Sequence, residues 1–120
     1  MCNDYQLMVD IASVIKDFAD LKIKIRFGEG APNLEARKDI KITDIGPIVR
    51  TIAGLRDEAE LVQRRWSCPG PNKRPIYIRS EGREFASNRC LVIADGFYEL
   101  TDPKDPKKTR KDKWLFTKKD

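Results

Sequence analysis

The stretch that most constrains the fold runs from Arg89 to Leu100. Its first half, Cys90 to Ala94, is an unbroken run of five apolar residues. A run of this kind fits a strand that is covered on both faces, so we expect it in the middle of a sheet. Asp95 and Gly96 interrupt the run, and the side chains that follow point alternately to opposite faces.

Glu99 is the candidate catalytic residue of this stretch. It follows Phe97 by two residues and therefore shares a face with it. A carboxylate beside an aromatic ring, at the end of so apolar a strand, should lose hydration, which would raise its pKa and make it a proton donor near neutral pH. In the alternative, Asp95 and Gly96 form a two-residue hairpin turn and Glu99 is an ordinary solvent-facing strand residue. The stretch alone leaves both interpretations open.

Length and charge narrow the class of protein. A chain of 120 residues has the length of a single domain, which we expect to span residues 1–120. The 24 Lys and Arg residues outnumber the 19 Asp and Glu residues, which gives a net charge of +5. This excess favours anionic partners, nucleic acid first, although it could equally serve solubility alone.

Cysteine and histidine usage exclude several kinds of site. The three cysteines, Cys2, Cys68 and Cys90, are too few and too scattered for a disulfide framework, which favours a reduced, cytoplasmic protein. Histidine is absent, so Ser-His and Cys-His catalytic pairs are excluded, and we expect no metal and no cofactor. No apolar run approaches the roughly 20 residues of a membrane span, and the first residues do not resemble a signal peptide.

Cys2 directly follows the initiator Met1. Because cysteine is small, removal of the methionine is easy and would leave an N-terminal cysteine with an amine and a thiol on adjacent carbons. The α-amine has a reference pKa of about 7.7 to 8.0, so part of it is neutral and nucleophilic at cellular pH. With an aldehyde it forms an imine, to which the thiol adds to close a thiazolidine ring. In the alternative, Cys2 is simply an incidental second residue.

The spacing of apolar residues predicts one short helix and several strands. Residues 21–27 alternate charged and apolar side chains, as a strand does, and residues 40–52 and 61–66 form further extended segments. Asp10 can cap a helix over residues 10–20. The buried stripe of that helix comprises Ile11, Val14, Ile15 and Phe18.

Prolines and charges mark the loops. Residues 67–75 contain three prolines and a glycine and form a loop that cannot be helical. Residues 101–113 are rich in lysine and proline, and we expect a long hairpin excursion that returns through a strand at residues 114–117. We expect the lysines of this excursion to be solvated rather than to contact DNA specifically.

Several residues suit contact with nucleic acid, each with a structural alternative. Arg65 and Trp66 could bind phosphate and stack on a base, or could form a structural cation-π contact. Arg79 could fork onto a phosphate with Arg83 adding charge nearby, or both could pair with neighbouring glutamates. Pro47 belongs at a bend or a sheet edge, because it cannot donate a ladder hydrogen bond; it could be an apolar wedge or part of the core.

Five pieces of the chain together resemble the SRAP family, named for SOS response-associated peptidases. They follow the family's order, and the similarity spans nearly all 120 residues. The most specific combination is the Met-Cys start with the Ala-Asp-Gly-Phe-Tyr-Glu segment. The pieces are residues Met1–Asn3, Gly46–Arg50, Arg65–Trp66, Arg79–Arg83 and Arg89–Glu99.

The resemblance implies an α+β fold of mainly antiparallel strands in an irregular pseudo-barrel with flanking short helices. It also implies a DNA-damage protein, associated with the nucleoid, that binds single-stranded DNA and crosslinks covalently to abasic sites. By this resemblance Cys2 is the nucleophile and Glu99 the catalytic glutamate. Arg79 binds a phosphate, Trp66 forms a wall of the DNA-binding site, and Pro47 acts as a wedge against the DNA. The peptidase name implies removal of residues before the cysteine, here Met1 alone.

Two departures from the family pattern weaken this expectation. The family has an asparagine that contacts the abasic sugar two residues before Arg79, where this chain has Tyr77, a bulkier residue with one hydroxyl. The family's catalytic histidine belongs to a later segment that this chain lacks, so we expect a domain that is incomplete at its C-terminal end. In the alternative, the chain is a catalytically impaired fragment that binds single-stranded DNA noncovalently.

Overall fold

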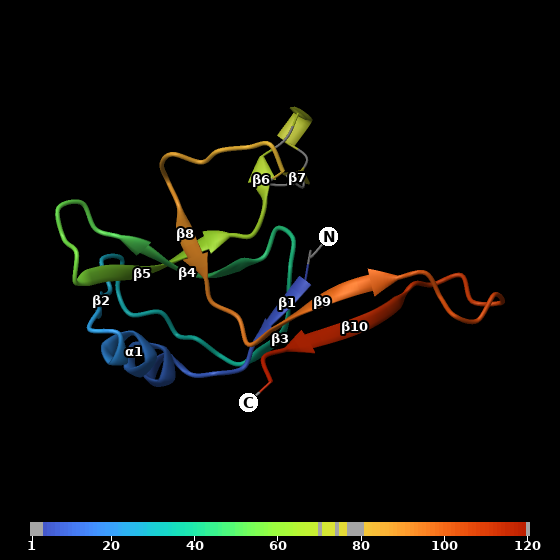
Figure 1. The fold of residues 1–120 in the computed structure, drawn as a ribbon, viewed down its shortest axis with the longest axis horizontal. Helices are drawn as coiled ribbons and strands as arrows, with labels where there is room; N and C mark the ends of the chain where they lie inside the picture. The colour runs from blue at the N-terminus through green and yellow to red at the C-terminus, as the bar shows by residue number, and fades with distance from the viewer. Residues whose placement is uncertain (1–3, 70, 74, 77–80, 120) are drawn as a thin grey trace.

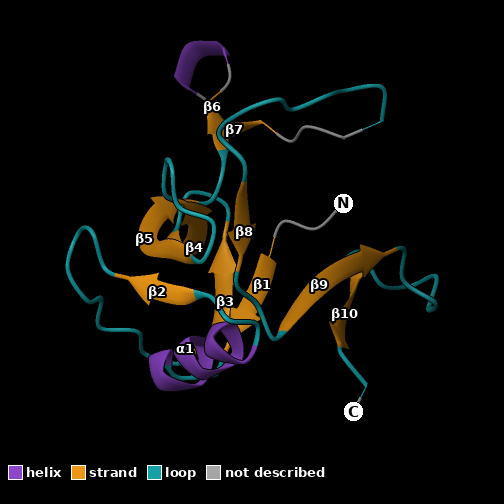
Figure 2. Cartoon of the chain, turned by 60° about the vertical axis from the view of Figure 1, so that its left-hand side comes forward, coloured by secondary structure: helices purple, strands orange, loops and turns teal. Residues whose placement is uncertain are grey.

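A computed structural model of the chain describes residues 4–69, 71–73, 75–76 and 81–119 (Figure 1). These residues form one α-helix and ten strands, arranged in two four-stranded sheets and a two-stranded one (Figure 2). Nearly all strand pairs are antiparallel; β2 and β5 alone run parallel in the described part of the chain. The predicted α+β class with mainly antiparallel strands is therefore confirmed.

The first sheet has the strand order β10-β9-β1-β3, and all its pairs are antiparallel. The N-terminal strand thus lies inside the sheet, next to the strand that carries Glu99. Its register sets Asp4 opposite Tyr98 and Tyr5 opposite Phe97. The strands are β1 (Asp4–Leu7), β3 (Arg37–Lys41), β9 (Gly96–Thr101) and β10 (Asp112–Thr117).

The second sheet has the order β2-β5-β4-β8, and β6 and β7 form the short third sheet. The expected strand over residues 21–27 is shorter, β2, but keeps its alternation, with Ile25 buried between exposed Lys24 and Arg26. The strands are β2 (Lys24–Arg26), β4 (Ile45–Thr51), β5 (Glu58–Arg65), β8 (Cys90–Val92), β6 (Cys68–Pro69) and β7 (Pro75–Ile76). The predicted loop at residues 67–75 also contains the short 3-10 helix η1 (Pro71–Lys73).

The apolar run at residues 90–94 does not lie in the middle of a sheet, so this prediction was wrong. β8 is an edge strand that pairs with β4 alone, and Leu91 and Val92 are 60% and 41% exposed. Ile93, the residue after the strand, packs against both core clusters. Periodicity does not distinguish an apolar edge strand that leads from one sheet to the next from a buried strand.

Pro47 was also misplaced by the sequence pattern. It lies in β4, an interior strand, where it is opposite Gln63 of β5. The sheet tolerates a proline here because β8 pairs only with residues 48–50. On that side of Pro47 there is no neighbouring strand to which a backbone N–H would have to donate.

The helix α1 (Ile11–Asp20) begins as predicted. Asp10 is its N-cap, accepting a hydrogen bond of 2.8 Å from the Ser13 N–H. The hydrogen bonds between Asp10 and Ser13 hold the pKa of the Asp10 carboxyl below its usual value. Val14 is buried and Phe18 packs against the core, whereas Ile15, predicted to be buried, is 37% exposed.

The core consists of two clusters. One lies between α1 and the second sheet and contains Val14, Ile25, Val49, Ala59 and Leu61. The other belongs to the first sheet and contains Tyr5, Leu7 and Ile40, with Trp66 packed against it.

The strands β9 and β10 with the loop at residues 102–111 form a hairpin, called the arm below, which confirms the predicted excursion (Figure 1). The arm projects from the rest of the molecule, and the radius of gyration is 16.6 Å, where about 14 Å is expected for a compact chain of this length. In the described residues β10 and β3 end one sheet and β2 and β8 end the other. The expected pseudo-barrel is therefore not closed.

Candidate functional site

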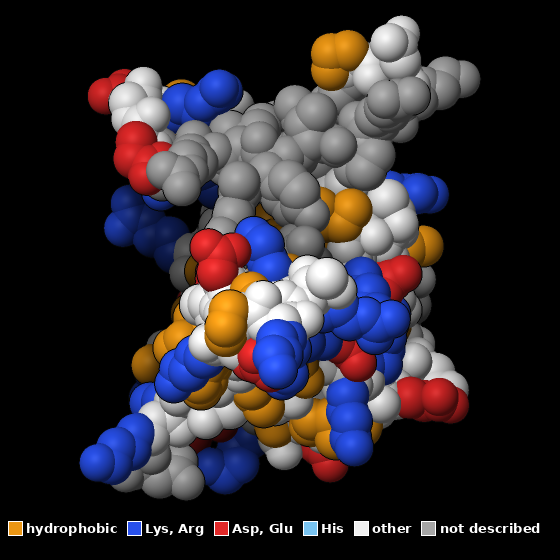
Figure 3. Space-filling view, turned by 90° about the vertical axis from the view of Figure 1, so that its right-hand side faces the viewer, with side chains coloured by type: hydrophobic (Ala, Val, Ile, Leu, Met, Phe, Trp, Pro, Cys, Tyr) orange, Lys and Arg blue, Asp and Glu red, His pale blue; other side chains and the backbone are white. Residues whose placement is uncertain are grey.

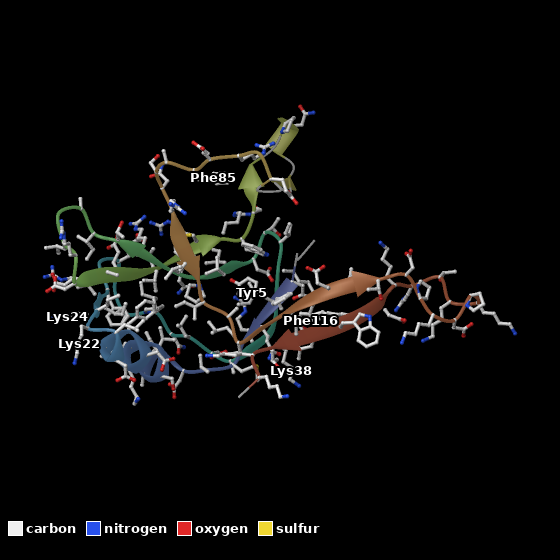
Figure 4. The ribbon with its side chains drawn as sticks, viewed as in Figure 1. Tyr5, Lys22, Lys24, Lys38, Phe85 and Phe116 are labelled. Atoms are coloured by element: carbon white, nitrogen blue, oxygen red, sulfur yellow. The ribbon has the colours of Figure 1, made fainter. Side chains whose placement is uncertain are left out.

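The predicted site residues fall into two groups. Cys2, Tyr77 and Arg79 lie outside the residues that the structure describes. Pro47, Trp66, Arg83 and Glu99 are described but do not form one cluster. Arg83 is exposed in the loop that leads into β8. The label of Phe85 shows where this loop lies in Figure 4.

Glu99 lies in β9, half-buried, with Trp114 of β10 opposite it. The alternative of a hairpin turn at Asp95 and Gly96 was wrong, because β8 and β9 belong to different sheets. Gly96 instead allows β10 to approach closely: a Cβ there would lie 2.9 Å from the carbonyl oxygen of Phe116.

Asp95 fixes the junction between the two sheets. Its N–H donates to the carbonyl oxygen of Gln6 at 3.0 Å. Its carboxylate accepts hydrogen bonds from the N–H groups of Met8 and Val9, the latter at 3.2 Å. The start of β9 is thereby held against the end of β1.

One face of the arm carries three exposed aromatic side chains. Directly paired residues share a face, so Phe116 lies with Phe97, and Trp114 lies with Glu99. The rings of Phe97 and Phe116 stack at 5.3 Å between centroids, and Trp114 donates from Nε1 to Thr101 Oγ1 at 2.8 Å. We call this surface the aromatic face; it comprises Phe97, Trp114 and Phe116, which are 43%, 43% and 49% exposed.

The opposite face of the arm is anchored by a charged cluster. Lys113 Nζ lies 2.8 Å from a carboxylate oxygen of Asp4 and 2.8 Å from one of Asp39. It also lies 4.0 Å from the ring centroid of Tyr98. A cavity of about 330 Å³ borders this cluster, lined also by Lys41 and Leu100.

The two carboxylates respond differently to Lys113. Burial raises the pKa of Asp4, which is 6% exposed, even though Lys113 opposes this change. The hydrogen bond from Lys113 lowers the pKa of the exposed Asp39. Both carboxylates raise the pKa of Lys113, so its ammonium stays charged and links the arm to β1 and β3.

Pro47 and Trp66 contribute mainly to packing. Pro47 is buried in β4, which fits the core alternative rather than a wedge. Trp66 is half-buried and meets Tyr5 edge to face at 5.5 Å between centroids (Figure 4 labels Tyr5). Its Nε1 is buried and has no hydrogen-bond partner among the described residues.

Several basic side chains of the second sheet are paired with carboxylates. Arg64 lies 2.7 Å from Glu29, whose pKa it lowers through the hydrogen bond, and Arg50 lies 2.6 Å from Glu60. The C-terminal part of the chain has fewer carboxylates to pair with its basic side chains. Residues 102–119, which comprise the loop of the arm, β10 and the residues after it, hold eight Lys and Arg against three Asp. Figure 3 looks along the arm from its tip and shows Lys and Arg side chains on several sides, with hydrophobic side chains between them.

Sequence reasoning missed both the aromatic face and the Lys113 cluster. Lys113 and Asp39 are 74 residues apart, so no local pattern joins them. From the sequence, Trp114 and Phe116 are predicted only to belong to a returning strand at residues 114–117. Their pairing with Phe97 and Glu99 follows from the hairpin register, which depends on where the long loop ends.

Searches for other features and for relatives gave three results. No helix in the described part of the chain combines the length and apolar character needed to cross a membrane. No group of three or more Cys, Asp or Glu side chains in that part could hold a metal ion. No family model, curated protein or solved structure matches the chain.

Proposed function

We propose that this protein is an SRAP-like DNA-damage protein that binds single-stranded DNA and captures abasic sites covalently through Cys2. The observation that supports this most is the β1-β9 pairing. Asp4 lies opposite Tyr98, the neighbour of Glu99, and Cys2 precedes Asp4 by two residues. Two residues of chain span at most about 7 Å, so the proposed nucleophile is tethered close to the strand that carries the proposed acid.

The chemistry requires no cofactor. Removal of Met1 frees the α-amine of Cys2, which attacks the aldehyde carbon of a ring-opened abasic sugar. Loss of one water gives an imine, and the thiol then adds across the carbon-nitrogen double bond. The product is a thiazolidine in which the former aldehyde carbon carries new bonds to nitrogen and sulfur. The amine is suited to this step because its reference pKa, about 7.7 to 8.0, leaves part of it neutral at cellular pH.

Glu99 is proposed as the acid of this reaction. It would protonate the ring oxygen of the closed sugar to release the aldehyde, and then assist loss of water from the amine adduct. Its place in β9, the strand that pairs with β1 just after Cys2, supports this role.

The chain departs from the family in ways that predict a slow reaction. No histidine is present, and Tyr77 stands where the family has asparagine. A positioned acid or base contributes typically 10² to 10⁴-fold, so we expect crosslinking slower by about this factor than with a complete set of groups.

The test uses the purified chain and a single-stranded oligonucleotide with one abasic site. Intact mass first establishes that Met1 is absent. A denaturing gel should then show a slowly migrating product that Cys2→Ala abolishes and Glu99→Gln slows. The matched control is Cys90→Ser, because Cys90 is the exposed free thiol in the described residues and should be dispensable. A protein that lacks Met1 yet gives no Cys2-dependent product would refute the proposal.

The second candidate function is noncovalent binding of single-stranded DNA by a catalytically impaired protein. The absence of any histidine favours it. It predicts equal affinity for intact and abasic oligonucleotides, weakened by salt and unchanged by Cys2→Ala.

A further inference from the structure

The aromatic face has the character of a binding surface rather than of incidental exposure. Three large aromatic side chains lie together, each more than two fifths exposed, on one face of one hairpin. Scattered apolar residues on a surface need no explanation, but a contiguous patch of this kind marks a binding site. The rings are also held in place, since Phe97 stacks on Phe116 and Trp114 is bonded to Thr101. Little side-chain freedom would be lost on binding.

The charge around this face indicates an anionic partner. The arm and the three residues after it, 96–120, hold eight of the 24 Lys and Arg residues and five of the 19 Asp and Glu residues, so they carry +3 of the net charge of +5. The ammonium of Lys104 lies 5.3 Å from the ring centroid of Trp114. A positive group beside an exposed ring can meet a phosphate while the ring meets a base.

We infer that the aromatic face is a stacking platform for the bases of single-stranded DNA, with the arm lysines along its phosphates. This inference rests on the proposed function and names where the strand lies. Single-stranded DNA offers a flat π-face and a negative charge at every nucleotide, which matches exposed rings flanked by lysines. A depression of about 350 Å³ lined by Phe97, Phe116 and Lys118 lies at the inner end of the face.

A second copy of the chain is the competing occupant, because β10 is a sheet edge that could pair with its own counterpart. Charge opposes this arrangement. Both copies would carry the same excess of positive charge, and like charges brought together are destabilising. DNA meets the same lysines with opposite charge.

The position of Glu99 connects the platform to the chemistry. Alternation along β9 places Glu99 on the same face as Phe97, and its cross-strand neighbour is Trp114. Bases on either side of an abasic site could stack on Trp114 and on the Phe97-Phe116 pair. The nucleotide without a base would then lie between them, next to Glu99.

The experiment measures binding of a fluorescently labelled, intact oligothymidylate by anisotropy. Intact DNA has no aldehyde, so the measurement is independent of crosslinking. Trp114→Leu and Phe116→Leu keep apolar bulk but remove the ring, and each should weaken binding about 5-fold or more. The matched control is Phe85→Leu, an equally exposed aromatic outside the arm, which should bind as the unaltered chain does. Circular dichroism verifies that each variant is folded.

A charge variant keeps the inference testable if a ring variant does not fold. Lys104→Gln changes an exposed loop side chain and should weaken binding while lowering the slope of log affinity against log salt by about 0.7. Trp114→Leu should weaken binding without changing that slope.

Two results would overturn the inference. One is that the ring variants bind intact DNA as tightly as Phe85→Leu does. The other is a concentration-dependent dimer in sedimentation that Trp114→Leu abolishes while DNA affinity is unchanged, which would assign the face to a second copy. Failure of the proposed function looks different: the abasic oligonucleotide would bind, sensitive to Trp114→Leu, but form no Cys2-dependent product.

Discussion

The body of the molecule is formed by α1, β1, β3 and the second sheet. It differs from the arm in the burial of its apolar side chains and in the pairing of its charged ones. In the body Ile40 and Leu61 are fully enclosed, and Arg50 and Arg64 are paired with glutamates. In the arm aromatic rings face outward among lysines. Stability is therefore expected to be concentrated in the body, whereas the arm leaves its aromatic side chains at the surface.

The largest effect should come from the core of the body. Leu61→Ala removes a fully buried side chain from β5 and should lower the free energy of unfolding by about 2 to 5 kcal/mol. Urea unfolding followed by Trp66 fluorescence, in a Trp114→Leu background, measures this effect at the body itself. A loss well below 1 kcal/mol would contradict the division between body and arm.

The junction of the two regions should give an intermediate effect. Lys113→Met takes the ammonium away from the buried carboxylate of Asp4 and should cost about 1 to 3 kcal/mol at pH 7. Burial raises the pKa of Asp4, so its charge costs stability above that pKa, and the cost disappears as the pH falls through it. The deficit should therefore shrink in acid. Unfolding at several pH values, with Asp4→Asn/Lys113→Met as the matched control, measures it; a pH-independent deficit would argue against this cause.

The start of α1 should show a smaller effect with a defined pH dependence. The pKa of Asp10 is lowered in the folded protein by its hydrogen bonds with Ser13, so its contribution is complete above the unfolded value of about 3.9. The contribution is lost as the pH falls through the folded value. Asp10→Ala should lower the unfolding midpoint at pH 7 but have little effect near pH 2. Asp10→Asn, which keeps the cap without the charge, should lose this pH dependence.

The smallest effect is expected in the arm. Leu115 is 48% exposed on the face opposite the aromatic rings, and Leu115→Ala should change the free energy of unfolding by less than about 0.5 kcal/mol. Urea unfolding of this variant beside Leu61→Ala compares the same substitution in the two regions. Equal losses at the two positions would remove the distinction between them.

Local signals in the sequence predicted local structure well. The cap at Asp10 and the helical spacing of Val14 and Phe18 located α1, and the lysine-rich and proline-rich excursion located the hairpin. These features depend on neighbours within a few residues, which the sequence displays directly.

Features that depend on strand order were not predictable in the same way. Nothing in the apolar run at residues 90–94 distinguishes an interior strand from an edge strand that crosses between sheets. Pro47 suggested an edge, yet it is tolerated inside because β8 happens to end before it. The cluster around Lys113 joins three strands that are distant in sequence, so only the assembled sheet reveals it.

The place of β1 between β3 and β9 has a consequence for biosynthesis. β1 cannot pair with β9 until β9 has been made, and the hydrogen-bonded residues Val9 and Asp95 at this junction are 86 residues apart. At 5 to 20 residues per second this leaves the β9 side of β1 unpaired for roughly 4 to 17 s. A processing enzyme that trims the first methionine would therefore meet β1 while its β9 side is still open, and maturation of the thiol would precede assembly of that side of the sheet.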